Sequence, residues 1–400
     1  MRRAAAVVLA ALAPVLAACG SDGDPSTKIT SDTLTIYSSL PLRGVQAETG
    51  RAVLRGEKLA LDEAGGRVGD LDIGLIALDD TKTSTGEWDP HQVAANARIA
   101  AENPSTIAYI GDLDSGASAI SVPIVNEIGV LQVSPLSGYT GLTQPSDKGE
   151  PAKYYPSGRR TFARLVPPGE TEARALAGWI RDLGFARVAV AFDGRQEGLG
   201  YGLELERGLR AAGVTVLERV RVEDGEQAAG PARELVAAGA PAVVYAGASV
   251  VKAAEVLSEV ARLSPTVELF ATSGVTGAPL ADALRDVEDR LHMISPLLPL
   301  AQRPPEARRF AARYRERFGA IPPPEALFGY EAMRGVLAAI RSAGTNGNDR
   351  QAVIDAYFAT QAQSSVLGPY AIDKDGDVTE APIGAFTAAD GRLRFEDLLD

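Results

Sequence analysis

The chain has 400 residues, 46% of them hydrophobic and 23% charged, and its 52 acidic residues outnumber the 40 basic ones to give a net charge of −12. This composition predicts a folded protein of two or three domains and disfavours intrinsic disorder, while the acidic balance without a basic cluster argues against a nucleic-acid partner. With two histidines and one cysteine, Cys/His metal sites and catalytic pairs are disfavoured, and no internal disulfide is possible.

The first nineteen residues are typical of a secretory signal. Two arginines are followed by an uncharged, Ala/Val/Leu-rich run from Ala4 to Leu16, which is too short to span a bilayer of about 30 Å. The run ends in Leu16-Ala17-Ala18-Cys19-Gly20, which resembles a bacterial lipobox. That resemblance implies removal of residues 1–18 and a lipid on Cys19; the alternative is a plain secretory signal with a chance cysteine.

Residues 19–32 are small and polar, as expected of a flexible tether. A lipid on Cys19 would hold the rest of the chain at the outer face of the cytoplasmic membrane, in a periplasm or at an exposed cell surface. Cys19 is then an anchor and not a redox or catalytic group.

After the tether, short β-branched runs alternate with helical patterns, which predicts parallel sheets with helices on both faces. We expect a first series with strands at 34–38, 71–78, 106–110 and 130–134 and helices at 51–64, 91–102 and 116–128. A polar stretch over 138–160 interrupts the pattern. A second series follows, with helices at 170–183, 201–212, 228–238, 250–263 and 278–289 and strands at 187–192, 214–222, 242–246, 267–271 and 291–294.

The tail of the chain is rich in helices, at 305–318, 325–343 and 350–360, with short strand-like pieces around Tyr370 and Phe386. It has too few strands for a third α/β domain, so we expect it to pack back onto two lobes and to make each of them discontinuous. The expected division is 33–163 with 298–367 for the first lobe, and 164–297 with 368–400 for the second.

Ligands of open α/β sheets bind beyond the carboxyl ends of the strands, so the loops there are the first candidates. In the loop over 111–118, Ser115 is placed to cap a helix, which would leave the amide of Gly116 and the next two amides facing an anion such as a carboxylate. The alternative is a helix cap without a ligand. Asp112 and Asp114 add negative charge beside Ser115, so they either face a ligand cation or are solvated.

A second candidate loop follows the next strand. Ser137, Gly138 and Tyr139 supply hydroxyls, backbone amides and one aromatic ring at a bend, although runs of this kind are usually plain turns. In the second series, Glu197 and Tyr201 follow a strand and are placed to reach a cleft from that side.

Two glycine-containing loops resemble cofactor or metal sites only weakly. Gly198-x-Gly200 has Leu203 where a dinucleotide-binding loop has its third glycine. The acidic run over 373–377 lacks the glycine position and the final glutamate of a calcium loop, and a hairpin turn accounts for it better. We therefore expect no cofactor and no metal.

Taken in order, the motifs resemble those of the branched-chain amino-acid (Leu/Ile/Val)-binding proteins of ABC transporters, which have the type I periplasmic-binding-protein fold. The resemblance covers essentially the whole chain after the signal. The motifs that carry it are Leu40-Pro41-Leu42-Arg43-Gly44, Leu78-Asp79-Asp80, Asp89-Pro90, Gly111 to Ser118, Gly129 to Pro135, Tyr330-Glu331-Ala332-Met333 and Val366-Leu367-Gly368-Pro369-Tyr370.

The resemblance implies two Rossmann-like α/β lobes with parallel sheets, joined by three hinge crossings near 161–167, 295–300 and 367–370. A ligand would bind between the lobes and close them, and the closed form, a monomer, would dock on an ABC permease. Carried over to this chain, the pattern places Ser115 on a ligand carboxylate and adds groups from the loop after the next strand. Thr49 is a further candidate contact.

Three positions depart from the family's pattern. The threonine that holds the ligand aligns with Gly138, the cleft tyrosine of the second lobe with Glu197, and the acidic partner of the ligand's ammonium group with Ser273. Because a buried cation needs a carboxylate, we predict that Glu197 takes that part, with Asp114 in reserve. The ligand class stays open among branched aliphatic amino acids, other amino acids, amides and small cationic metabolites.

The preferred interpretation is a lipid-anchored solute receptor that feeds an ABC importer. A ligand-sensing lipoprotein of the same fold, without a transport role, is the alternative that the chain alone does not separate from it. An extracellular enzyme on a two-lobed scaffold is disfavoured. The two histidines of the chain, which an enzyme could use, have structural explanations instead, since His91 stands near a helix start and His292 begins a buried strand.

Overall fold

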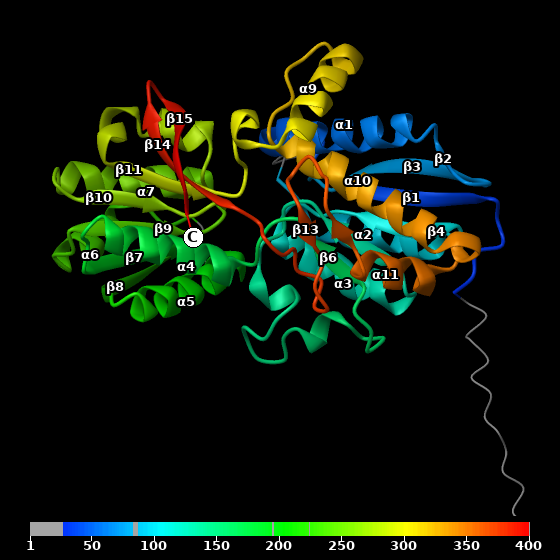
Figure 1. Cartoon of the computed structure of the whole chain (residues 1–400). Helices are drawn as coiled ribbons and strands as arrows, with labels where there is room; N and C mark the ends of the chain where they lie inside the picture. Colours follow the sequence, from blue (N-terminus) through cyan, green and yellow to red (C-terminus); the bar gives the residue numbers. More distant parts are fainter. Residues whose placement is uncertain (1–26, 83–86, 194–195, 224, 400) are drawn as a thin grey trace, which may run out of the picture.

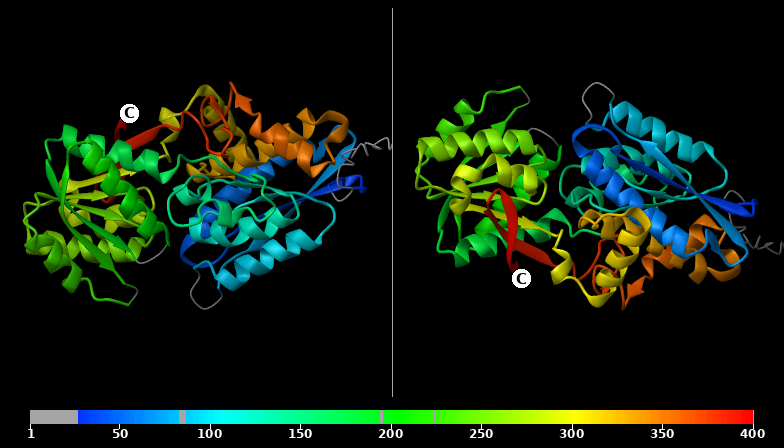
Figure 2. Two further views of the ribbon diagram at one scale, coloured as in Figure 1. Left: turned by 90° about the horizontal axis from the view of Figure 1, so that it is seen from below. Right: turned by 90° about the horizontal axis from the view of Figure 1, so that it is seen from above.

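Two α/β lobes lie side by side in the computed structural model, each with one sheet covered by helices on both faces (Figure 1). The structure describes residues 27–82, 87–193, 196–223 and 225–399. The same arrangement is visible from below and from above (Figure 2), where the last strands of the chain return to the second lobe. The expected α/β fold with two sheets of mostly parallel strands is confirmed.

The first lobe has a six-stranded sheet. Its elements are β1 (Thr33–Leu40), α1 (Ala47–Glu63), β2 (Arg67–Val68), β3 (Leu71–Asp79), α2 (Pro90–Glu102), β4 (Thr106–Ile110), α3 (Ser115–Glu127), β5 (Leu131–Ser134) and β6 (Phe162–Arg164). The strand order is β2-β3-β1-β4-β5-β6, and β2 at the edge is antiparallel to its neighbour. Because the helices connect parallel strands, the carboxyl ends of β1, β4 and β5 lie at one edge of the sheet.

The second lobe has a seven-stranded sheet. Its elements are α4 (Gly169–Asp182), β7 (Arg187–Asp193), α5 (Gln196–Ala211), β8 (Thr215–Val222), α6 (Ala229–Ala237), β9 (Ala242–Ala246), α7 (Val250–Leu263), β10 (Glu268–Ala271), α8 (Ala278–Ala283), β11 (Leu291–Ser295), β14 (Ile383–Ala389) and β15 (Arg392–Leu399). The strand order is β15-β14-β11-β10-β9-β7-β8. The expected helix over 278–289 is wrong beyond Ala283, because the chain continues as a 3₁₀ segment in which Val287 has a φ of −134°.

The helices of the tail cover the first lobe. These are α9 (Pro305–Phe318), α10 (Glu325–Ser342) and α11 (Arg350–Phe358). Helices α10 and α1 pack backbone to backbone, since a Cβ on Gly56 would lie 2.1 Å from the Ala326 carbonyl oxygen and one on Gly329 would lie 2.1 Å from that of Val53. Only glycine fits at such a contact, so these two positions set how closely the tail docks.

The third crossing between the lobes lies later than expected. The expected boundary after 367 assigns Tyr370 to the second lobe, but Tyr370 is buried in the core of the first, where β13 (Tyr370–Ala371) pairs with β12 (Gln361–Ala362). Val378 is buried in the same core, and it closes the hairpin turn expected over 373–377. The chain therefore enters the second lobe between Val378 and Ile383.

A fully buried arginine joins the first and third crossings. Arg164, the last residue of β6, donates from Nε to Asp377 Oδ1 at 2.7 Å and from Nη1 to the Tyr139 carbonyl oxygen at 2.7 Å. Its Nη2 donates to the Thr143 hydroxyl. The guanidinium group thereby holds the loop after β5 and the turn over 373–377 against the start of the second lobe.

The first described residues are tied to the first lobe. The Ile29 amide donates to the Asn348 carbonyl oxygen at 2.8 Å, and the Asn348 side-chain amide donates to the Ile29 carbonyl oxygen at 2.7 Å. The Arg350 amide donates to the Thr27 carbonyl oxygen at 3.0 Å. Residues 27–29 therefore form a short strap against the loop that precedes α11.

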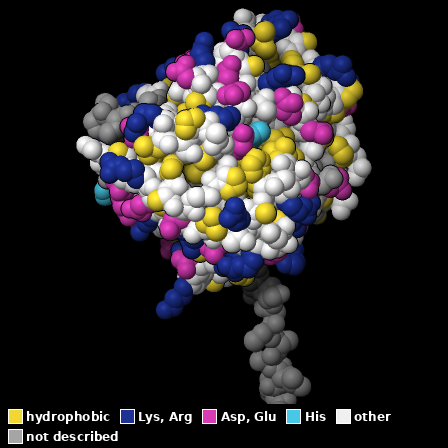
Figure 3. Space-filling view, turned by 90° about the vertical axis from the view of Figure 1, so that its left-hand side faces the viewer, with side chains coloured by type: hydrophobic (Ala, Val, Ile, Leu, Met, Phe, Trp, Pro, Cys, Tyr) yellow, Lys and Arg dark blue, Asp and Glu magenta, His cyan; other side chains and the backbone are white. Residues whose placement is uncertain are grey.

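The outer end of the second lobe carries acidic and basic side chains that are interspersed, with hydrophobic side chains between them (Figure 3). Among the described residues, no helix combines the length and apolar character that crossing a membrane requires. The predicted signal, Cys19 and the first part of the tether lie before residue 27, outside the described residues, and so stay predictions. The flexible tether expected over 19–32 is wrong at residues 27–29, because these residues are hydrogen-bonded to the first lobe and Ile29 is buried.

One buried carboxyl group makes the stability of the first lobe depend on pH. Burial raises the pKa of Glu57, on α1, to about 8. Because this folded-state pKa exceeds the unfolded value, the folded state binds more protons and the free energy of unfolding falls as pH rises from about 4.5 to 8. We expect Glu57→Gln to flatten this dependence and to stabilise the protein at pH 8 by a few kcal/mol, on the order of 3.

Urea unfolding of both proteins at pH 5, 6, 7 and 8 measures the effect. Glu127→Gln, which changes an exposed carboxyl at the end of α3 in the same lobe, is the control and should follow the parent protein. Parallel curves for Glu57→Gln and the parent would contradict the assignment.

Candidate ligand-binding site

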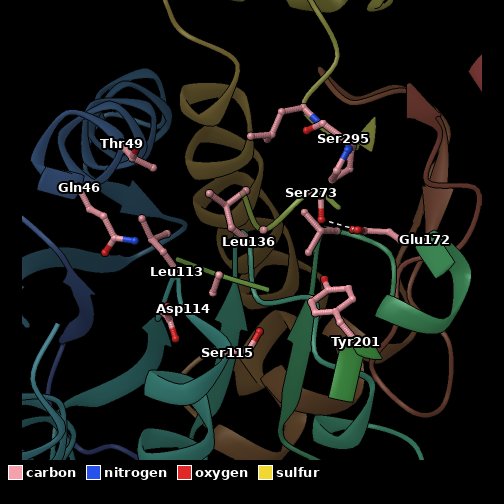
Figure 4. A pocket seen from close by; sticks show the side chains of 16 residues that line it. Gln46, Thr49, Leu113, Asp114, Ser115, Leu136, Glu172, Tyr201, Ser273 and Ser295 are labelled. Carbon is pink, nitrogen blue, oxygen red and sulfur yellow. Dashed lines mark hydrogen bonds between the residues drawn. The ribbon is translucent and has the colours of Figure 1, made fainter. Parts of the chain in front are cut away.

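A cavity of about 170 Å³ lies between the lobes, where the carboxyl ends of both sets of strands meet (Figure 4). The first lobe contributes residues that follow β1, β4, β5 and β6, and the second contributes residues from α4 and α5 and from the loops after β9, β10 and β11. The lining residues are Gln46, Thr49, Leu113, Asp114, Ser115, Leu136, Gly138, Val166, Glu172, Tyr201, Ala248, Ser273, Gly274, Ser295, Pro296 and Leu297. This is the position that the parallel topology predicts for a ligand.

The structure brings five of the sequence-predicted site residues together in this lining: Thr49, Asp114, Ser115, Gly138 and Ser273. Gly116, Ser137 and Tyr139 are not among the lining residues. Ser137 is fully buried, with its Oγ 2.7 Å from Ser118 Oγ and donating to the Asp112 carbonyl oxygen at 3.0 Å. Its hydroxyl therefore braces the loop and does not face the cavity.

The start of α3 differs from the sequence-based expectation. The helix cap is Asp114, not Ser115, because the Asp114 Oδ1 accepts a hydrogen bond from the Gly116 amide at 3.0 Å. The Ser115 hydroxyl accepts instead from the Tyr139 amide at 3.1 Å. The expectation that the Gly116 amide faces a ligand anion is wrong, since the protein's own carboxylate occupies that amide.

Tyr139 holds one lobe against the other. Its hydroxyl donates to Glu150 Oε2 at 2.7 Å, within the first lobe. Its ring packs on α5 of the second lobe, where a Cβ on Gly200 would lie 2.2 Å from the ring. The absence of a side chain at Gly200 therefore allows the close approach, and Tyr139 serves the lobe contact more than a ligand.

Glu197, the predicted ammonium partner, lies on α5, but its side chain is outside the described part of the structure. That prediction is therefore still untested. One turn further along α5, Tyr201 lines the cavity and is buried. A Cβ on Gly138 would lie 2.6 Å from the Tyr201 hydroxyl oxygen, so these two residues meet across the lobes.

The acidic side chain that the sequence analysis missed is Glu172, in the first turns of α4. It lines the cavity, it is 1% exposed, and it accepts a hydrogen bond from the Ser273 hydroxyl (Figure 4). Burial raises the pKa of Glu172 to about 7, which the hydrogen bond from Ser273 opposes. The sequence did contain a signal for this residue. Ser273 stands where the family has an acidic side chain, which indicates that another residue supplies the carboxylate.

Further acids lie behind the cavity wall. Burial raises the pKa of Glu204 on α5 to about 7. Burial likewise raises the pKa of Asp112 to about 7, and Asp112 accepts from the Ser121 hydroxyl at 2.6 Å beneath α3. Asp112 does not line the cavity.

In the described ranges, no group of three or more His, Cys, Asp or Glu side chains is arranged to hold a metal ion.

A sequence profile of the periplasmic binding protein family matches residues 33–392. Among solved structures, a leucine-binding protein LivK from Thermotoga maritima has a TM-score of 0.79 at 23% identity, covering 92% of this chain and 99% of its own. LivJ from Streptococcus pneumoniae, in complex with isoleucine, has a TM-score of 0.74 at 17% identity, covering 92% and 100%. No curated protein matches this chain.

A structure with a different kind of ligand is similar to the same extent. The solute-binding protein from R. palustris in complex with benzoate has a TM-score of 0.74 at 16% identity, covering 92% of this chain and 96% of its own. At these sequence identities the similarity establishes the fold but not the ligand, which must be inferred from the residues that line the cavity.

The cap of α3 generates a stability prediction. Replacing Asp114 with Ala removes the acceptor for the Gly116 amide, and we expect the free energy of unfolding to fall by about 1 kcal/mol. Asp114→Asn keeps an acceptor oxygen and should lose much less. Denaturant unfolding at pH 7 measures both changes, and equal losses would show that charge, not capping, stabilises the helix start.

Proposed function

The chain belongs to the periplasmic binding protein family, and we propose that it captures an amino acid or a related small polar metabolite between its lobes and delivers it to an ABC importer. The buried Glu172 carboxyl in the wall of the interlobe cavity carries this proposal. Burial makes this carboxyl group costly to ionise, the charge of Arg164 offsets that cost only in part, and a ligand ammonium group would offset more of it. Glu172, held by Ser273, would then replace the acidic anchor that the family has at Ser273.

Ligand capture would use the hinge. Three crossings connect the lobes, and the cavity takes residues from both, so a bound ligand contacts both and favours the closed arrangement. The closed monomer would then be the form that docks on an ABC permease.

The proposal includes a lipid anchor at Cys19, on the strength of the lipobox-like sequence that ends at this residue. The folded lobes would then stay at the outer face of the cytoplasmic membrane, within reach of the permease. Replacing Cys19 with Ser should release the protein from the membrane fraction, whereas a variant that stays there would contradict lipidation.

The proposed role is binding and not catalysis. Neither histidine lines the cavity: His91 stands in the exposed first turn of α2, and His292 pairs with Glu268 at 2.8 Å, where β10 and β11 begin. We expect the ligand to be recovered unchanged after incubation with the protein.

A thermal-shift screen of the purified protein against amino acids, amides and amines tests the proposed function. A ligand at one hundred times its dissociation constant should add about 2.7 kcal/mol of stability. Uptake of the labelled ligand by cells with and without the gene then separates import from sensing. No stabilisation by any of these classes would overturn the proposal.

The ionisation of Glu172 generates a pH prediction. Titration of this carboxyl near pH 7 is influenced by Ser273, Glu204 and Arg164, with burial as the main effect. Because an ammonium group favours the carboxylate form, affinity for a cationic ligand should rise as pH increases from 6 to 8. Glu172→Gln should weaken binding at pH 8 at least tenfold and flatten the pH dependence, as measured by isothermal titration calorimetry; an unchanged profile would exclude Glu172 as the partner.

A further inference from the structure

We propose that the cavity selects an aliphatic amine that carries no carboxylate, so that its charged groups are all cationic. This inference rests on the proposed function and narrows its ligand class. It follows from the helix N-termini at the cleft, where a ligand carboxylate would normally be bound, and from the charges that line the cavity.

At the first of these helices, α3, a carboxylate of the protein occupies one of the N-terminal amides. Asp114 Oδ1 accepts from the Gly116 amide at 3.0 Å, and the Ser118 amide donates to the Asp114 carbonyl oxygen at 3.0 Å. The Asp114 carboxylate therefore stands where the carboxylate of an amino acid would gain from the helix dipole. A ligand carboxylate at this place would meet a like charge.

The same device recurs across the cleft at α7. Asp193 is buried at the end of β7, and its Oδ2 accepts from the Ala248 amide at 2.7 Å and from the Ser249 amide at 2.9 Å. Ala248 lines the cavity. The amides that precede α7 on the cavity side are thus also occupied by an acidic side chain of the protein.

The third helix at the cleft, α4, gives its first amides to the other lobe. The Gly169 amide donates to the Gly138 carbonyl oxygen at 2.7 Å, and the Glu170 amide donates to the Thr140 hydroxyl at 3.0 Å. At all three helix starts, some amides consequently donate to acceptors of the protein before a ligand arrives, and at two of them the acceptor is a carboxylate.

The charges of the lining point to the same class. Asp114 lies on one side of the cavity and Glu172 on the other (Figure 4), and none of the described lining residues is Lys, Arg or His. The buried Arg164 is committed to Asp377 and to the Tyr139 carbonyl. Among the described lining residues, a carboxylate ligand would face two acids and no basic side chain, which is unfavourable in a buried site.

The rest of the lining describes the uncharged part of the ligand. Leu113, Leu136, Val166 and Leu297 supply an apolar surface, and the cavity of about 170 Å³ is smaller than the roughly 300–1,000 Å³ of clefts that hold drug-sized molecules. A short aliphatic chain with an ammonium group fits both its size and its chemistry.

Calorimetry on the purified protein at pH 8 with matched ligand pairs tests the proposal. The pairs are leucine with leucinamide and with 3-methylbutylamine, and lysine with 1,5-diaminopentane. Within each pair the aliphatic chain and the amine are kept, and the carboxylate is replaced by an amide or removed. We expect at least one carboxylate-free member to bind at least tenfold more tightly than its amino acid. Equal or tighter binding of the amino acids would overturn this inference and leave the proposed function standing. No binding by any member would also overturn this inference, whereas the thermal-shift screen decides the proposed function.

Variants show whether the acids of the cavity set this preference. Asp114→Asn keeps the cap of α3 while removing its charge, and Glu172→Gln removes the opposing charge. Each should reduce the ratio of amine to amino-acid affinity at least fivefold. Asp182→Asn, at the exposed end of α4, is the matched control and should leave the ratio unchanged; an unchanged ratio in both cavity variants would contradict the proposal.

Discussion

The geometry of the cleft depends on one buried cation. Arg164 has no access to solvent, so its charge must be met inside the protein, and Asp377 together with the Tyr139 carbonyl and the Thr143 hydroxyl does so. These partners come from segments far apart in the chain, and they meet where β6 leaves the first lobe. The loop that Arg164 holds presents Gly138 to the cavity and to the start of α4. The position of a single guanidinium group thereby sets the wall of the cavity and the first turn of the second lobe.

Periodicity predicted the regular elements well, because β-α-β units carry their pattern locally. The strands expected at 106–110 and 242–246 coincide with β4 and β9, and the helix expected at 250–263 coincides with α7. The local sequence pattern did not predict the elements whose position depends on contacts between distant segments of the chain. β6 has three residues, too few for an alternating signal, and the third crossing moves because the burial of Tyr370 and Val378 in the first lobe outweighs local sequence.

The candidate site was predicted in part for a topological reason. Loops after parallel strands share one edge, so Ser115, Gly138 and Ser273 meet although more than 150 positions separate the first from the last. Glu172 was missed because an acidic residue in the first turns of a helix ordinarily faces solvent and complements the helix dipole. In the fold, the Glu172 side chain instead lies against the loop after β10, where the Ser273 hydroxyl donates to it. The caps were interchanged for a similar reason, since Asp114 and Ser115 are both good caps and tertiary contacts choose between them.

The strap over residues 27–29 has a mechanical consequence. Its hydrogen bonds run to the loop around Asn348, so a pull on the N-terminus is borne by the first lobe. The second lobe is joined to that lobe through the crossings, and a load applied at Thr27 does not pass through the hinge. In the proposed hinge motion, the first lobe would be the fixed base and the second lobe would move. That motion would thereby be insulated from tension applied at Thr27.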